Sequence, residues 1–171
     1  MRNLMKLSAV LLMVVMAVTV KAQTLKFGHI DMQALISVMP ERATAETEFN
    51  AFQSELEEVL GEMQKELQTK MTEFEGLGEA ASEIKRNAKV QEIQDLQQRI
   101  QNYQVTAQQQ LQQKQTDLLQ PVFDKAEKAI ADVAKENGLI YVFDIGPKVI
   151  LYQSSQSTDV MPMVKKKLGI Q

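Results

Sequence analysis

The sequence contains no cysteine, no tryptophan and a single histidine, His29, among its 171 residues. Without cysteine the chain forms no disulfide, has no thiol nucleophile and lacks the residue that carries the lipid of bacterial lipoproteins. A single histidine excludes a multi-histidine metal site within one chain. The sequence also has no nucleotide-binding loop. These absences argue against an enzyme, and we expect no catalytic residues, no metal and no cofactor.

Two carboxylates are the best candidates for acid and base chemistry that remain. Asp31 and Asp144 each lie at the end of a predicted strand. Aspartates at such positions usually accept hydrogen bonds from turns or cap a helix, and nothing around them predicts a pocket. A structural role is therefore the favoured interpretation, and the same holds for His29 in the first strand.

Long apolar runs are also missing, except at the beginning of the chain. Arg2 and Lys6 precede an apolar run over residues 7–20, which ends in a Val-Lys-Ala cleavage signal. The run is too short to span a bilayer, which takes about 20 apolar residues. We therefore predict that residues 1–22 are a secretory signal peptide and that the exported protein, beginning near Gln23, is soluble.

The charge balance restricts the possible partners. Loss of the signal peptide removes three basic residues and lowers the net charge from −3 to about −6. Binding to nucleic acid requires clustered Lys and Arg to neutralise phosphates. We therefore expect no nucleic-acid partner, and the short basic run at 165–167 is interpreted as complementing the negative end of a final helix.

Two long runs with an apolar residue at every third or fourth position occupy the middle of the chain. In the first run these residues are Phe49, Phe52, Leu56, Val59, Met63, Leu67, Met71, Phe74 and Leu77. In the second run they are Ile84, Ala88, Ile93, Leu96, Ile100, Tyr103, Ala107, Leu111, Leu118 and Val122. This is the spacing of a coiled-coil seam. Gly76 and Gly78, on either side of Leu77, allow the chain to reverse.

The pattern predicts a long antiparallel helical hairpin over residues 43–120, with its tip near 76–78. At 1.5 Å per residue each helix of the hairpin is roughly 55 Å long, which exceeds the diameter of an ordinary small domain. The hairpin must therefore project from a body formed by the remaining residues, 23–42 and 121–171.

The predicted body contains short strands and short helices. Alternating or β-rich residues predict strands at 25–31, 140–143 and 149–152, the last two joined as a hairpin through Gly146-Pro147. Helical segments are expected at 32–39 and from about 160 to 168, and Pro121 is expected to interrupt the path of the second long helix. The fold class is thus mainly α with a small β body (α+β).

One chain is too small to cover such a sheet, so several chains are expected to pool their strands. The segment Tyr141–Phe143 is apolar on both faces, which indicates burial on both sides. The candidate residues of this oligomerisation body are Phe27, Ile30, Tyr141, Val142, Phe143, Ile150 and Leu151. The spacing alone does not set the number of subunits.

The first strand at 26–33, the glycine-tipped hairpin and the closing segments at 141–144, 149–152 and 159–160 together resemble the Skp (OmpH-like) family of periplasmic chaperones. The resemblance covers essentially the whole chain after the signal peptide. It implies a jellyfish-shaped homotrimer, in which a small β-barrel body joins three subunits and three helical tentacles enclose a cavity. It also implies an ATP-independent periplasmic holdase that keeps unfolded outer-membrane proteins from aggregating until they insert.

The resemblance directs attention to apolar residues on the arm as contacts for an unfolded client. Met63, Met71, Phe74 and Leu77 are the candidates, since methionine adapts to varied partners and Leu77 lies between the tip glycines. At seam positions, however, each is more often packed against the partner helix. The 12 glutamines between residues 91 and 115 are interpreted first as a solvated helix face and second as a client-facing lining.

The charges at the tip differ from those of the family. Its best-known members have basic tentacle ends, whereas Glu73, Glu75, Glu79 and Glu83 surround this tip. This difference argues against contact with lipopolysaccharide or an anionic membrane. It leaves apolar contacts and avidity as the expected source of affinity.

An exported scaffolding coiled coil is the alternative function. It would have the same heptads and the same oligomer. Two features argue against it: Lys114 interrupts the second seam, and the paired glycines make the tip mobile.

Overall fold

The computed structural model describes residues 25–79 and 81–170, and the predicted signal peptide therefore lies outside the described residues. The chain is mainly helical and contains one small sheet, which confirms the predicted α+β class. In order, the elements are β1 (Lys26–Ile30), α2 (Met32–Ser37), α3 (Pro40–Glu75), α4 (Glu83–Glu136), β2 (Leu139–Asp144), β3 (Thr158–Asp159) and α5 (Met161–Leu168).

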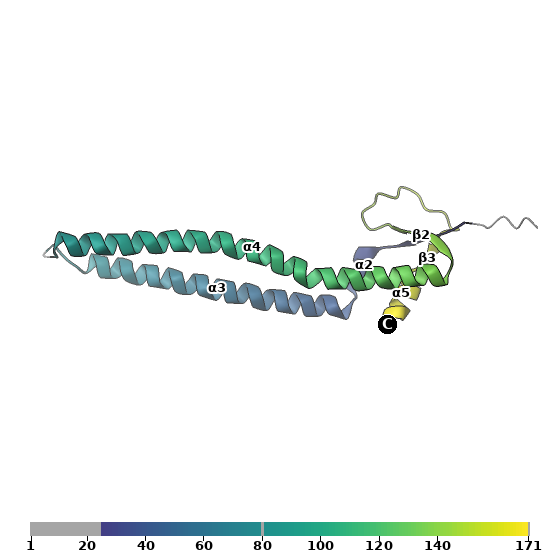
Figure 1. Ribbon diagram of the computed structural model, residues 1–171, viewed down its shortest axis with the longest axis horizontal. Coiled ribbons are helices and arrows are strands. Elements are labelled where there is room, and N and C mark those ends of the chain that lie inside the picture. Colours follow the sequence, from purple (N-terminus) through teal and green to yellow (C-terminus); the bar gives the residue numbers. More distant parts are fainter. Residues whose placement is uncertain (1–24, 80, 171) are drawn as a thin grey trace, which may run out of the picture.

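The helices α3 and α4 run antiparallel and side by side along most of the molecule (Figure 1). Proline occupies the first turn of α3, where its missing amide donor costs nothing. The side chain of Ser82 caps α4 by accepting a hydrogen bond from the amide of Lys85. Between the two helices Gly78 adopts a φ of +63°, so the reversal falls at the predicted glycines. We call α3 and the adjoining part of α4 the arm.

The interface between the two helices shows the predicted spacing of three and four residues, but not at every predicted position. Val59, Met71 and Ile84 were expected in the seam, but their side chains are exposed, and that of Ile84 is 82% exposed. The half-buried positions are instead Leu60 and Lys70. A lysine is tolerated there because its aliphatic stem packs while its ammonium group reaches a carboxylate.

The part of α4 beyond the arm belongs to the body and contributes to its core. The helix continues through Pro121, so this proline does not end it, although α4 changes direction where it leaves the arm (Figure 1). Side chains from α2, α4, β1 and α5 meet in one apolar core made up of Ile30, Leu35, Ile36, Met39, Val122, Ala126, Ala129, Val133, Val160 and Val164. At the base of the arm, Lys125 of α4 binds Glu41 of α3, and this hydrogen bond lowers the pKa of the Glu41 carboxyl.

The sheet has the order β2-β1-β3, and both strand pairs are parallel. The predicted hairpin is therefore wrong: residues 149–152 are not a strand, and the third strand is the polar pair Thr158–Asp159. The amide of Ile145 donates to the carbonyl of Ile30, which extends the pairing of β2 with β1 by one residue, and the chain next pairs at β3, on the other edge of β1.

Candidate functional site

The arm has very little core of its own. In the described part of the arm beyond its base, the only buried side chains are those of Leu96 and Ile100, 1% and 8% exposed. Met63, Phe74 and Leu77 are half-buried, and Met71 is exposed. The four predicted client contacts are thus spread along the arm, and the structure does not bring them together into one pocket.

Polar contacts hold the two helices of the arm together where the core is thin. The hydroxyl of Tyr103 donates to the carbonyl of Leu56 at 3.3 Å. The Lys114 ammonium, which was predicted to interrupt the seam, lies 5.7 Å from the centre of the Phe52 ring. This cation–π contact explains how a charged residue is accommodated at a seam position.

Ion pairs join the helices near the tip. Lys89 binds Glu73 at 2.9 Å and Glu92 at 3.2 Å, and Lys70 binds Glu92 at 3.0 Å. The hydrogen bond from Lys89 lowers the pKa of the Glu73 carboxyl. One carboxylate of the predicted acidic tip, that of Glu73, is thus paired with a lysine from farther along α4. At the reversal itself, Arg86 donates to the carbonyl of Gly78 at 2.7 Å.

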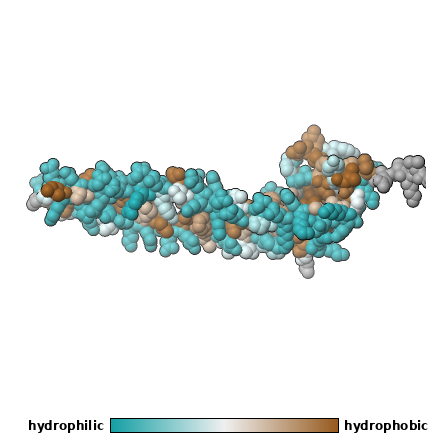
Figure 2. Space-filling view, in the orientation of Figure 1, coloured by the Kyte–Doolittle hydropathy of each residue, from teal (hydrophilic) through white to brown (hydrophobic). Residues whose placement is uncertain are grey.

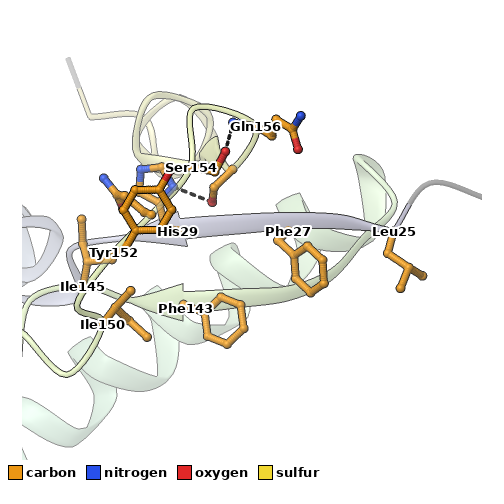
Figure 3. A pocket seen from close by; sticks show the side chains of 11 residues that line it. Leu25, Phe27, His29, Phe143, Ile145, Ile150, Tyr152, Ser154 and Gln156 are labelled. Atoms are coloured by element: carbon orange, nitrogen blue, oxygen red, sulfur yellow. Dashed lines mark hydrogen bonds between the residues drawn. The ribbon is translucent and has the colours of Figure 1, made fainter.

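Aromatic side chains cover the outer face of the sheet. The rings of Phe27, Tyr141 and Phe143 stack on one another with centroids 5.9 to 6.5 Å apart, and all three are exposed. Figure 3 shows Phe27 and Phe143 pointing to the same side of the two strands, with Ile150 and Tyr152 of the following loop beside them. Together with other residues these side chains line a pocket of about 430 Å³.

The other residues predicted for the oligomerisation body divide between the two faces of the sheet. Ile30 belongs to the core, and Val142 packs against it, so both contribute to the inner face. Leu151 is 97% exposed, in a loop where residues 149–152 leave four large apolar side chains open to solvent. Figure 2 shows hydrophobic surface gathered over the body, whereas most of the visible arm is hydrophilic.

His29 lies in the same outer face and makes a structural contact. Its Nδ1 is 2.9 Å from the Ser157 hydroxyl, which ties the loop before β3 to the middle of β1. The amide of Val160 also donates to the carbonyl of His29 at 3.0 Å. These bonds fix β3 on the free edge of β1.

The two candidate carboxylates cap backbone groups. Asp31 accepts from the amide of Ala34 at 2.8 Å and caps α2, while Asp144 accepts from the amides of Met32 and Gly146 at 3.1 and 2.9 Å. A Cβ on Gly146 would lie 2.9 Å from Oδ1 of Asp31, so a side chain at this position would displace the carboxylate that caps α2. The predicted structural role is therefore confirmed. No group of three or more possible metal ligands occurs among the described residues.

Comparison with models of known protein families gives a match over most of the chain. A family model described as outer membrane protein (OmpH-like) matches residues 26–168, a range that includes every described helix and strand. A search of curated proteins gives no match. No helix in the described ranges is both long and apolar enough to cross a membrane.

Proposed function

The chain belongs to the outer membrane protein (OmpH-like) family, and we propose that it is an ATP-independent periplasmic holdase for unfolded outer-membrane proteins. The observation that carries this proposal is the arm, which extends far beyond the body and, in its described part beyond the base, has only Leu96 and Ile100 as buried side chains. Such an arm has the surface to contact an extended client at many points. Because its core is thin, its two helices can also adjust to different clients.

We further propose that copies of the chain associate through the outer face of the sheet. The rings of Phe27, Tyr141 and Phe143 stack on one another, Ile150 lines a pocket with two of them, and Leu151 is exposed in the same loop as Ile150. Exposed apolar side chains in such number mark a protein interface. A trimer is the number that the family resemblance implies. Several arms on one body would raise the effective concentration of each weak client contact.

Release of the client requires no nucleotide in this mechanism. Each contact with the arm is weak, so a client leaves when a more stable state is reachable, which for an outer-membrane protein is the folded barrel in its membrane. The chain distinguishes unfolded clients from folded ones, because a folded barrel has no free extended segments to lie along the arm.

The test is light scattering of the chain from Gln23 onward, alone and mixed with a urea-unfolded outer-membrane barrel protein diluted into buffer without nucleotide. We expect a trimer that keeps the barrel protein soluble in a complex of defined mass and does not bind the folded barrel. An unchanged mass, with the barrel protein aggregating, would reject the holdase function and favour a scaffold.

A double variant tests the interface. Replacing Tyr141 and Phe143 by serine leaves the apolar core unchanged, because both side chains lie on the outer face. The expected result is a folded monomer. Replacement of the exposed Val105 on the arm by serine is the matched control and should leave the mass unchanged.

A further inference from the structure

The outer surface of α4 carries side-chain amides and almost no charge along the middle of the arm. All 12 glutamines between residues 91 and 115 are exposed. Between Ile100 and Gln113 this helix has no charged residue at all, over about 20 Å of its length. A surface helix usually carries charges on its solvent side, so this composition is a distinct feature of α4.

The neighbouring helix has the opposite character at the same level. The contact between Tyr103 and Leu56 places residues 51–64 of α3 beside the neutral part of α4. That segment of α3 has no basic residue and carries four exposed acidic side chains, Glu55, Glu57, Glu58 and Glu62. The arm therefore presents one acidic surface and one neutral surface to solvent, back to back.

Four residues of α4 form a line along the neutral surface, which we call the amide stripe: Gln101, Val105, Gln108 and Gln112. Their spacing of four, three and four residues places them on one side of the helix. All four are exposed, and Val105 is 60% exposed. Within the part of the chain that the structure describes, the three glutamine side chains make no hydrogen bond, whereas Gln91 and Gln113 nearby bind Asp95 and Asp117.

The chemistry of the stripe matches that of a polypeptide main chain. A glutamine amide has two donors and one acceptor and no charge, and thus complements the peptide group. Residues four apart on a helix are about 6 Å apart along its axis. Groups on the same side of an extended chain repeat about every 6.6 Å. Gln101 and Val105, and likewise Gln108 and Gln112, have this spacing of about 6 Å, while Val105 and Gln108 are about 4.5 Å apart. An extended segment lying along α4 would therefore meet one amide, the Val105 side chain and then two further amides in turn.

We propose that the amide stripe binds the main chain of an extended, unfolded polypeptide, with Val105 contacting its apolar side chains. This inference rests on the proposed holdase function and specifies which chemical groups of the client are recognised. Because the main chain is common to all sequences, binding along the stripe does not depend on the client's side-chain order. Because the stripe is neutral, its affinity does not depend on ionic strength as that of a charged surface does.

The first experiment replaces Gln101, Gln108 and Gln112 by glutamate, which keeps side-chain shape and helix propensity but removes the donors and adds charge. We expect an increase of at least about tenfold in the Kd for a fluorescently labelled, urea-unfolded barrel protein, because three hydrogen bonds are lost. The matched control adds the same charge on α3 through Asn50→Asp, Gln64→Glu and Gln68→Glu, all at exposed positions. The control should bind within about twofold of the unmodified chain.

The second experiment isolates the main chain of the client. A synthetic peptide copying one membrane strand is compared with the same peptide carrying N-methyl groups on alternate amides, which removes donors but keeps every side chain. The unmodified peptide should bind several times more tightly, and its Kd should change by less than about twofold between 50 and 500 mM NaCl.

The outcomes separate the inference from the proposed function. If the chain holds unfolded barrels but the α4 and α3 variants bind equally, or the two peptides bind equally, the inference is wrong and the holdase function stands. If the α4 variant without client forms an oligomer of different mass from that of the unmodified chain, the stripe pairs copies of this chain, and the inference is also wrong. If no unfolded client binds the unmodified chain, both proposals fail.

Discussion

Replacing Leu96 by alanine should loosen the whole arm while leaving the body intact. Leu96 is 1% exposed and, with Ile100, makes up the buried part of the described arm beyond its base. The side chains around it on α3 are only half-buried. Removing three carbon atoms there therefore deletes much of the apolar contact between the two helices.

The size of the effect follows from this setting. Leu→Ala substitutions in protein cores cost about 2 to 5 kcal/mol, and the cost rises with the cavity that remains. In a two-helix arm the neighbouring side chains can move into the space, so we expect the lower part of that range, about 2 to 3 kcal/mol. At 1.4 kcal/mol for each factor of ten, this corresponds to a change in opening equilibrium of about 30- to 140-fold.

Amide hydrogen exchange followed by mass spectrometry measures this change segment by segment. Peptides from α3 and from the arm portion of α4 should exchange about 30 to 140 times faster in the variant, because they open together. Peptides from α5 and the end of α4 should keep their rates, since those segments belong to the core of the body. A urea unfolding curve of the whole protein would report on the arm and the body together and is less informative.

The matched control is Val105→Ala on the same helix. Val105 is 60% exposed, so its truncation should alter exchange by no more than about twofold. If Leu96→Ala also changes arm exchange by less than threefold, the two helices are held by their polar contacts rather than by this small core. Equal acceleration in arm and body would instead show that the chain opens as a single unit.

Three further predictions concern the body and the tip. Gly28→Ala would place a methyl group 2.8 Å from Cδ1 of Leu139, and overpacking of about 1 to 3 kcal/mol should lower the urea midpoint of the body. Asp144→Ala removes the acceptor of two backbone amides and should cost a similar amount in the same assay, whereas Asp144→Asn should recover part of it. At the tip, Lys89 lowers the pKa of Glu73, so this pair stabilises the arm above the usual carboxyl pKa and stops doing so as pH falls through the lowered value. Lys89→Gln should therefore flatten the pH dependence of thermal unfolding of the arm between about pH 5 and pH 3, and an unchanged profile would show that the pair does not contribute.

The sequence was sufficient to predict the long helices because their signals are local. Apolar residues at every third or fourth position, a proline at position 40 and paired glycines at the tip each act within a few residues. The exact residues of the seam could not be predicted. Packing against the partner helix decides whether the next seam position lies three or four residues further along the chain. Lys70 occupies a seam position that hydropathy assigned to Met71, since its ammonium group reaches Glu92 across the interface.

The sheet was predicted less well because strand pairing is not a local property. Val149–Tyr152 has a higher β propensity than Thr158–Asp159, yet only the polar pair forms a strand. The edge of β1 is taken by β3 through the bond between Val160 and His29. In the described part of the chain, residues 149–152 pair with no strand, and their exposed apolar side chains are among those that we assign to contacts between copies.

The surfaces that we propose for self-association and for client binding lie on different parts of the molecule. The surface proposed for self-association is apolar and lies on the body, where Tyr141 and Leu151 are exposed. The surface proposed for clients is neutral and polar and lies on α4, where a continuous apolar stripe would have drawn the arms of neighbouring subunits together. A glutamine surface avoids that collapse and still offers hydrogen bonds to a main chain.

Since the two surfaces share no residue, substitutions in one should combine additively with substitutions in the other when each arm binds alone. Where avidity across several arms matters, a monomeric double variant should lose affinity for long clients but keep its affinity for a short peptide. An unchanged affinity for the long client would show that a single arm is already sufficient, whereas equal losses for the long client and the short peptide would show that the body surface itself binds clients.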